Sequence, residues 1–186
     1  MHNRSHTTGS MIINDNIRIL CAAVLAGASF AAAAQSGPAA DTRWHAGVQL
    51  GTVQDNGRTD PSVQLTFGYD FDRTWGVEAL LNANLQFVRD GTDPTQPYEF
   101  DSAYGARVLA TLPVSGNWNL VGGLGVAQVH EERGLTIHGY GRDRTGALVS
   151  AAAMYRVSRR WSVGLELASF TASHTFNAGL RGELHF

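Results

Sequence analysis

Residues 75–87 read WGVEALLNANLQF, and this stretch decides the fold class because apolar and polar positions alternate along it. Every odd-numbered residue from Trp75 to Phe87 is apolar, whereas Glu78 and Asn82 are among the even-numbered ones. A period of two is typical of a β-strand, in which successive side chains point to opposite faces. The stretch therefore predicts a long strand with one apolar and one polar face.

Seven further segments of the chain show the same alternation. They are residues 44–51, 63–70, 101–110, 118–126, 147–156, 161–168 and 176–186. Gly122 interrupts the apolar face of the fifth strand in chain order. Beyond residue 34 no apolar run approaches the length of about 18 residues that a membrane-spanning helix needs. The sequence thus predicts an all-β protein of eight strands.

The four tryptophans each open one of these segments, at Trp44, Trp75, Trp118 and Trp161. In an up-and-down barrel alternate strands start at the same rim, so these side chains are expected at one end. An amphipathic ring is most stable at the boundary between hydrocarbon and water. We therefore predict an eight-stranded antiparallel up-and-down transmembrane β-barrel. Its aromatic girdle comprises Trp44, Tyr69, Trp75, Trp118, Tyr155, Trp161 and Phe186.

The connections between the predicted strands alternate in length. Those at residues 71–73, 113–116 and 158–160 are tight, those at 54–60, 89–98 and 130–144 are longer and polar, and the last, at 171–174, is short. Short turns at one end and longer loops at the other are typical of outer-membrane barrels. The tryptophan end would then be the periplasmic rim, and both chain termini would lie in the periplasm.

The polar face of the predicted strands is rich in small residues, which suit the narrow interior of eight strands. It also carries charges of both signs: Glu78, Arg107, Arg156, Glu166, Arg181 and Glu183. A charge in a confined lumen is costly unless it is paired. We predict a structural salt-bridge network that fills the lumen and leaves no large pore. The alternative is a narrow ion path gated by exchange of these pairs.

The N-terminal part has the pattern of a secretory signal peptide over residues 1–34. Residues 19–34 form an apolar run that follows Arg18 and ends in alanines before Gln35. Residues 1–10 are interpreted as an upstream extension before Met11, residues 35–41 as a leader, and 42–186 as the barrel. Cys21 would leave with the signal peptide, so no disulfide is expected. A transmembrane helix is the alternative interpretation of the run.

Composition excludes some functions. The chain has 14 basic residues, none of them lysine, against 16 acidic ones, and it shows no basic patch typical of nucleic-acid binding. No cofactor motif is present. His130, Glu131, Glu132 and His138 share one predicted loop but lack tight ligand spacing, so no metal site is predicted.

The last strand, LRGELHF at residues 180–186, alternates up to Phe186 and resembles the C-terminal signature by which outer-membrane barrels are recognised for assembly. Residues 105–127, GARVLATLPVSGNWNLVGGLGVA, resemble the strand-turn-strand segment at mid-barrel of the small eight-stranded OmpA/OmpX-type barrels. The likeness covers residues 42–186. It implies a Gram-negative outer membrane, and a structural, envelope-integrity or surface-interaction role. The implied partners are lipid, lipopolysaccharide, the barrel-assembly machinery and a surface ligand for the loops. The oligomeric state stays open.

Two alternative classes of protein are an outer-membrane lipid A-modifying enzyme and a soluble ligand-binding barrel. The segment around Ser173 and His174 is similar to the His-x-Ser-Asn segment of lipid A 3-O-deacylase barrels, but Phe176 stands at the serine position, so we expect no enzyme. A soluble ligand-binding barrel would instead require the apolar face inside. Arginines in or beside the predicted outer loops are candidates for charge-assisted contacts with lipopolysaccharide phosphates: Arg58, Arg89, Arg133, Arg142 and Arg144.

Overall fold

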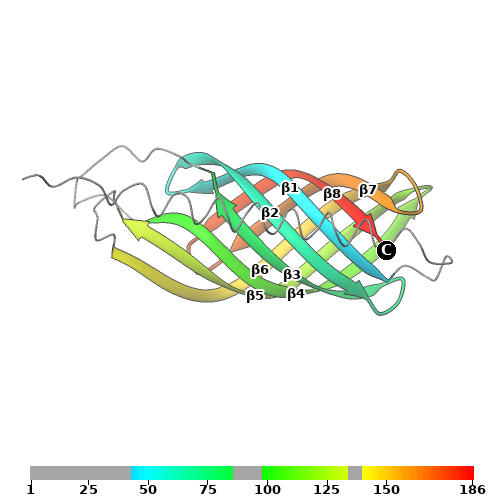
Figure 1. The fold of residues 1–186 in the computed structure, drawn as a ribbon, viewed down its shortest axis with the longest axis horizontal. Helices are drawn as coiled ribbons and strands as arrows, with labels where there is room; N and C mark the ends of the chain where they lie inside the picture. Colours follow the sequence, from blue (N-terminus) through cyan, green and yellow to red (C-terminus); the bar gives the residue numbers. More distant parts are fainter. Residues whose placement is uncertain (1–42, 86–97, 134–139) are drawn as a thin grey trace, which may run out of the picture.

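The computed structural model describes residues 43–85, 98–133 and 140–186, and in these residues eight antiparallel strands form a closed barrel (Figure 1). The strands are β1 (Trp44–Asp55), β2 (Arg58–Asp70), β3 (Trp75–Asn84), β4 (Glu99–Ser115), β5 (Trp118–Arg133), β6 (Tyr140–Arg156), β7 (Trp161–Phe170) and β8 (Thr175–His185). Each strand pairs with its neighbours in chain order, which confirms the predicted fold class. Among the described residues, no helix is long and apolar enough to cross a membrane.

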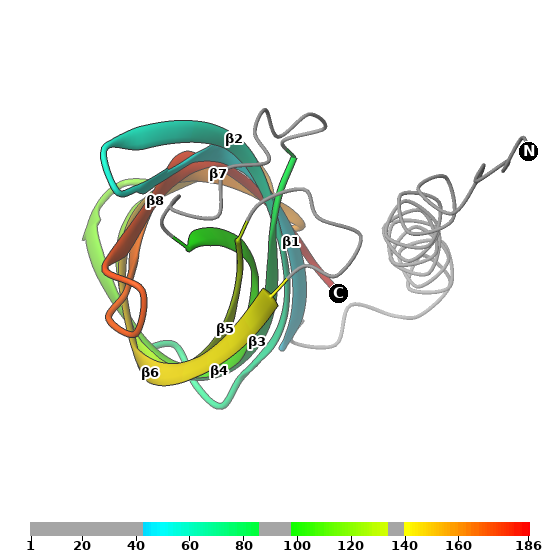
Figure 2. The ribbon, with the colours of Figure 1, turned by 90° about the vertical axis from the view of Figure 1, so that its left-hand side faces the viewer.

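The barrel closes where β8 pairs with β1, as the view along the barrel shows (Figure 2). His45 lies opposite His185 in this pairing, and Trp44 and Phe186 exchange backbone hydrogen bonds of 3.2 and 2.9 Å beyond it. In lipid, every backbone polar group must be bonded within the protein, and closure achieves this because no strand edge is left unpaired within the barrel wall.

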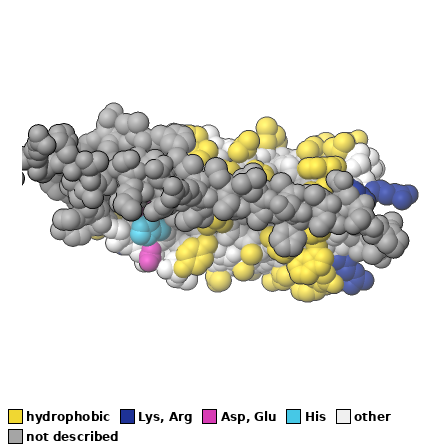
Figure 3. Space-filling view, in the orientation of Figure 1, with side chains coloured by type: hydrophobic (Ala, Val, Ile, Leu, Met, Phe, Trp, Pro, Cys, Tyr) yellow, Lys and Arg dark blue, Asp and Glu magenta, His cyan; other side chains and the backbone are white. Residues whose placement is uncertain are grey.

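The outer wall of the barrel is apolar. Leu50, Leu124 and Leu180 are 61, 65 and 68% exposed, and hydrophobic side chains lie on the parts of the wall that grey atoms leave visible between the two ends (Figure 3). A soluble ligand-binding barrel has the opposite arrangement, with the apolar face inside. The direction of the side chains therefore favours a lipid-facing wall over that alternative.

The prediction of a longer loop at residues 54–60 is wrong. β1 continues to Asp55 and β2 starts at Arg58, so only Asn56 and Gly57 form the turn. Both have positive φ, 48° and 80°, which is the backbone of the two-residue turns that best fit the twist of a hairpin. The Asn-Gly pair was a hairpin signal in the sequence.

The strands of the β4–β5–β6 region are longer than predicted. β4, β5 and β6 have 17, 16 and 17 residues, and β5 and β6 reach farther left in Figure 1 than their neighbours. The predicted loop at residues 130–144 is mostly strand; residues 134–139 lie outside the described residues, as does nearly all of the predicted loop at 89–98. The outward-facing side chains of β5 beyond the apolar wall, His130 and Glu132, are polar, so the hydrophobic alternation stops although the hydrogen-bonded ladder continues.

The turns at the tryptophan end are short. One of them, predicted over residues 113–116, is shorter still, because β4 continues to Ser115 and only Gly116 and Asn117 separate it from Trp118. The register of β4 against β5 shifts between Pro113 and Ser115, so a bulge absorbs the proline there.

Candidate functional site: the lumen and the outer wall

Four buried charges meet in the half of the lumen nearest the tryptophan end. This charge cluster consists of Glu78 on β3, Arg107 on β4, Glu166 on β7 and Arg181 on β8. Arg107 Nε donates to Glu78 Oε1 at 2.8 Å, and Arg181 Nη1 donates to Glu166 Oε2 at 2.7 Å. Arg107 also binds Glu166 and Arg181 also binds Glu78, so each arginine bridges both carboxylates.

The strand register and nearby glycines make this cluster possible. Glu78 and Arg107 are direct partners across β3 and β4, whereas Glu166 and Arg181 come from the neighbouring strands β7 and β8 on another part of the wall. A long arginine must cross the lumen to reach both glutamates. A Cβ atom added at Gly123 would lie 3.0 Å from Arg107 Cδ, and one added at Gly47 would lie 3.4 Å from Arg181 Nε. The missing side chains leave the space that the guanidinium stems occupy.

Further polar side chains extend the charge cluster. Glu183 Oε2 lies 3.2 Å from Arg181 Nε, and His45 Nε2 lies 3.3 Å from Glu78. The buried amides are Gln49, Gln64, Asn82 and Asn177, of which Gln64 contacts Glu166 and Asn82 contacts Gln64. These amides and His45 were not predicted as part of the site, although their place on the polar face was a signal.

Arg156, predicted together with these charges, does not lie in the lumen. It is exposed at the end of β6, beside the turn that leads to Trp161, and the structure does not bring it to the charge cluster. The strand alternation was read to its last residue, but side chains at a rim are free to turn outward.

The other half of the lumen holds a cluster of apolar side chains that was not predicted from the sequence. This apolar plug consists of Val53, Leu80, Phe100, Ala103, Ala127, Val129, Leu148, Ala168 and Phe170. The rings of Phe100 and Phe170 lie with centroids 5.8 Å apart. Leu80 was the available signal, because it is the one large apolar residue on the otherwise polar face of residues 75–87.

The two layers leave the lumen filled by side chains, and neither provides a set of catalytic groups. His174 is exposed with φ of 56°, whereas the neighbouring Ser173 is buried. Phe176, at the position where the deacylase pattern has serine, is 41% exposed on the outer wall. The structure does not bring these three residues together as a nucleophile and base.

The tryptophans lie at one end of the barrel, about half exposed. Trp44, Trp75, Trp118 and Trp161 begin β1, β3, β5 and β7 and are 46, 52, 50 and 52% exposed. Two of them pack against tyrosines. The ring centroids of Trp44 and Tyr69 are 4.8 Å apart, and those of Trp118 and Tyr155 are 5.2 Å apart. Phe186 follows the last residue of β8 at the same end.

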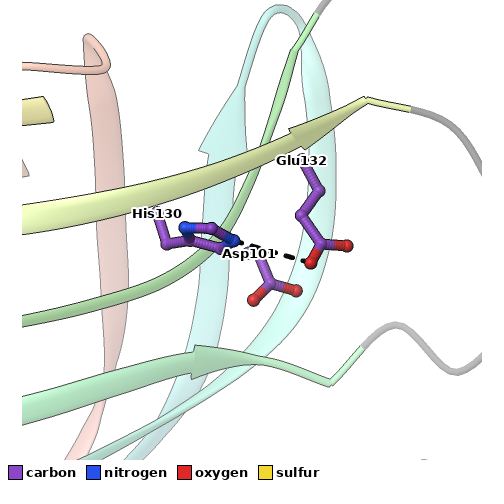
Figure 4. Close-up of side chains that lie close together, drawn as sticks. All are labelled: Asp101, His130 and Glu132. Atoms are coloured by element: carbon purple, nitrogen blue, oxygen red, sulfur yellow. Dashed lines mark ion pairs between the residues drawn. The ribbon is translucent and has the colours of Figure 1, made fainter. Parts of the chain in front are cut away.

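A cluster of ligand-type side chains lies on the outer wall where β4, β5 and β6 extend (Figure 4). This outer-wall cluster consists of Asp101, His130 and Glu132, whose carboxylate oxygens and imidazole nitrogen lie within 4.8 Å of one another. His130 Nε2 lies 3.5 Å from Glu132 Oε1. His130 Nδ1 lies 2.7 Å from Asp143 Oδ1 on β6. His130 and Glu132 were predicted to lie in a loop, so the strand face that they share and the nearby Asp101 were not predicted.

Three of the arginines predicted for the outer loops, Arg58, Arg142 and Arg144, lie at the end of the barrel opposite the tryptophans. Arg58 binds Glu99, Arg142 binds Glu131 and stacks 4.0 Å above the Tyr98 ring, and Arg144 Nη1 donates to Ala172 O at 3.1 Å. Arg89 lies outside the described residues. Arg133 is the last residue of β5, and its side chain lies outside the described part.

A closed barrel with an apolar outer wall, a lumen filled by charged and apolar side chains, and strands that extend at one end defines an integral outer-membrane barrel. Residues 20–182 match the family model described as outer membrane protein beta-barrel domain, and the chain belongs to this family. The protein is thus located in the bacterial outer membrane, as predicted. No curated protein matches the sequence.

Several solved structures share the fold. Ail, the attachment invasion locus protein of Yersinia pestis, in complex with the heparin analogue sucrose octasulfate, has 13% identity, a TM-score of 0.53, and coverage of 77% of this chain and 96% of that one. The N-terminal β-barrel domain of Pseudomonas aeruginosa OprF has 10% identity and a TM-score of 0.55, and the match covers 76% of this chain and 97% of that one. Neisserial surface protein A has 12% identity and a TM-score of 0.54, and the match covers 77% of this chain and 96% of that one. At these identities the similarity shows the fold alone.

Proposed function

We propose that this protein is a structural and surface-interaction component of the outer membrane, without a catalytic role and without a conducting pore. The filled lumen carries this proposal. The charge cluster is 0 to 4% exposed and the apolar plug 0 to 5%, so neither layer leaves a hydrated path along the barrel axis. What the molecule offers to partners is its lipid-facing wall and its outer end.

Conductance tests the closed lumen. The refolded protein, inserted into a planar bilayer, is expected to give no stepwise conductance over a range of voltages and salt concentrations, because eight strands enclose only side chains. A refolded porin serves as the positive control for insertion. Regular unitary steps that change when Glu78 or Arg181 is replaced would establish the gated ion path instead.

The outer end is proposed to contact lipopolysaccharide. Arg58, Arg142 and Arg144 are 56, 38 and 44% exposed there. Glu99 and Glu131 hold these guanidinium groups in place, and the remaining N–H groups are available for charge-assisted bonds to phosphate. The Ail structure, which has a similar fold, contains a polysulfated sugar, and sulfate and phosphate esters share the chemistry of a dense anion.

Binding to lipopolysaccharide tests this contact. We would place the barrel in nanodiscs made of phospholipid alone and titrate soluble lipopolysaccharide, with and without EDTA. The variant Arg58→Gln/Arg142→Gln/Arg144→Gln is expected to bind about tenfold more weakly in both conditions, whereas Arg73→Gln/Arg159→Gln at the opposite end is unchanged. Equal affinity of both variants for lipopolysaccharide would show that the three arginines do not contribute to binding. Loss of binding on addition of EDTA, with no effect of the arginine replacements, would show that bridging cations hold the lipopolysaccharide instead.

The absence of catalysis is a separate part of the proposal. It is supported by the different environments of Ser173, which is buried, and His174, which is exposed in the turn between β7 and β8. Incubation of the refolded protein with lipid A, followed by mass spectrometry, is expected to show every acyl chain retained. Release of one chain, abolished by His174→Gln, would instead establish an enzyme.

Export and assembly complete the proposal. Residues 1–34 are proposed to direct secretion, and β8, which closes the barrel against β1, to be read by the assembly machinery. The aromatic side chains of the tryptophan end would then lie at the periplasmic headgroups. Mass spectrometry of the protein from purified outer membranes is expected to find Gln35 as the first residue. A mature protein that retains residues 19–34 would contradict the signal-peptide interpretation.

A further inference from the structure

We propose that Asp101, His130 and Glu132 bind a divalent transition-metal ion of the Zn²⁺ class on the outer wall of the extended β4–β5–β6 region. The set combines one imidazole nitrogen with two carboxylates, which is a typical ligand set for such ions. The three ligand atoms already lie within 4.8 Å of one another (Figure 4). Tetrahedral zinc requires ligand separations of about 3 to 4 Å, given bonds of about 2 Å, so side-chain rotations alone complete the site.

Strand geometry, rather than a loop, brings these ligands together. His130 and Glu132 are two residues apart on β5 and therefore lie on the same face. Asp101 is the extra residue of a bulge in β4, where the register shifts between Phe100 and Ser102. A bulge re-aims a side chain, and here Phe100 enters the apolar plug while the Asp101 carboxylate faces His130.

Asp143 distinguishes this arrangement from an ordinary acidic patch. It lies directly opposite His130 in the β5–β6 pairing, and its carboxylate lies 2.7 Å from His130 Nδ1. A neutral imidazole with its proton on Nδ1 would donate to Asp143, which would orient the ring and present the Nε2 lone pair to a metal ion held beside Glu132. Metal-binding histidines almost always have such a carboxylate or carbonyl partner on the other ring nitrogen.

The ligand types select the ion. Ca²⁺ and Mg²⁺ prefer shells made only of oxygen ligands, whereas imidazole suits zinc, copper and nickel. Three protein ligands on an exposed wall leave a coordination position for water. The bound ion would join β4 and β5, and through Asp143 also β6, beyond the apolar belt of the barrel.

The full chain, refolded in a non-ionic detergent, is suited to isothermal titration with ZnCl₂. His2→Gln and His6→Gln are introduced in every protein compared, so that the N-terminal histidines do not contribute. We expect one Zn²⁺ per chain. The variant His130→Gln is expected to lose binding, and Asp143→Asn to weaken it by about 10- to 100-fold through loss of ring orientation. Because no lipopolysaccharide is present, the result does not depend on the proposed surface contact.

His138→Gln and His174→Gln are the matched controls, because each removes a histidine outside the outer-wall cluster; both should bind as the parent does. Glu132→Gln, an independent ligand variant, should weaken binding, and an unchanged heat-modifiable shift on SDS gels shows that each barrel is folded. Failure of the parent to bind Zn²⁺ up to the millimolar range would overturn the proposal. Binding that survives His130→Gln but not His138→Gln would overturn it equally.

Discussion

The half of the lumen nearest the tryptophans holds two arginines and two glutamates, whereas the other half holds Phe100, Phe170, Leu148 and smaller apolar side chains. Both halves are buried within the same eight strands. The charged half depends on every partner, since each arginine binds both carboxylates. The stability of the apolar half depends on how fully its side chains fill the space, because each dispersion contact contributes only a small increment. A single replacement should therefore act differently in the two halves.

Breaking the charge cluster should have the largest effect. Arg181→Met leaves Glu78, Glu166 and Glu183 without one shared cation and is expected to lower the free energy of unfolding by about 3 to 5 kcal/mol. Urea titration of the barrel in lipid vesicles, followed by circular dichroism, measures this. The matched control is Arg156→Met, which removes an exposed arginine and should change stability little. Equal losses for both would show that the buried pairing contributes nothing.

Truncation within the apolar plug should come next. Leu148→Ala leaves a cavity beside Phe100 and Phe170 and is expected to cost about 2 to 4 kcal/mol, depending on how far the plug collapses. The next residue, Val149, is 47% exposed on the outer wall, so Val149→Ala is a control on the same strand. The same urea titration compares the two variants. A larger loss for Val149→Ala would invert the assignment of the faces.

Crowding the charged half tests its packing. A Cβ atom added at Gly68 would collide with the imidazole of His45, which contacts Glu78, and would lie 2.7 Å from the backbone oxygen of Val77, so Gly68→Ala is expected to cost about 1 to 2 kcal/mol. At Gly122 an added Cβ atom meets nothing within 4 Å, and Gly122→Ala should be nearly neutral. Thermal unfolding of the two glycine variants gives the comparison. If both behave alike, His45 has room to move away and the charged half is loosely packed.

The smallest expected effect on the free energy of unfolding is at a turn outside the lumen, between β2 and β3. The N–H groups of Thr74 and Trp75 donate to Asp72 at 2.7 and 2.8 Å, and these bonds hold the pKa of its carboxyl below the usual value. Asp72→Ala should destabilise the barrel at neutral pH by less than the other destabilising replacements above, because the turn is exposed to solvent. The contribution is present above the unfolded-state pKa of about 3.9 and is lost as pH falls through the lowered folded-state pKa. Unfolding titrations at several pH values test it, and a pH-independent difference would contradict it.

The sequence predicted the parts of the fold that depend on contact with lipid. Alternation from Trp75 to Leu85 and its seven counterparts indicated a barrel, and the structure and family membership confirm it. The same signal failed at the outer ends of β4, β5 and β6, because the outward-facing side chains there are polar although the inward-facing Phe100 and Glu131 are buried. It also failed at Asn56 and Gly57, where polarity was read as a loop although the pair is typical of a two-residue hairpin turn.

The lumen was only partly predictable for a different reason. Strand alternation indicates which residues face inward but not their height along the axis, and height depends on the register between strands. Glu78 and Arg107 were recognisable as inward charges, yet the contacts of Arg181 with Glu78 join strands that are 103 residues apart in the chain. The apolar plug was missed because inward-facing Leu80, Leu148 and Phe170 share the composition expected of lipid-facing positions.

All four tryptophans lie at one end of the barrel, and this has a consequence for spectroscopy. Intrinsic fluorescence follows the ordering of that end alone, while the apolar plug and the outer ends of β4, β5 and β6 contain no tryptophan among the described residues. Opening of the far end would leave the emission spectrum unchanged but would reduce the circular dichroism signal. A gap between the two unfolding midpoints would thus measure how tightly the ends of the barrel are coupled.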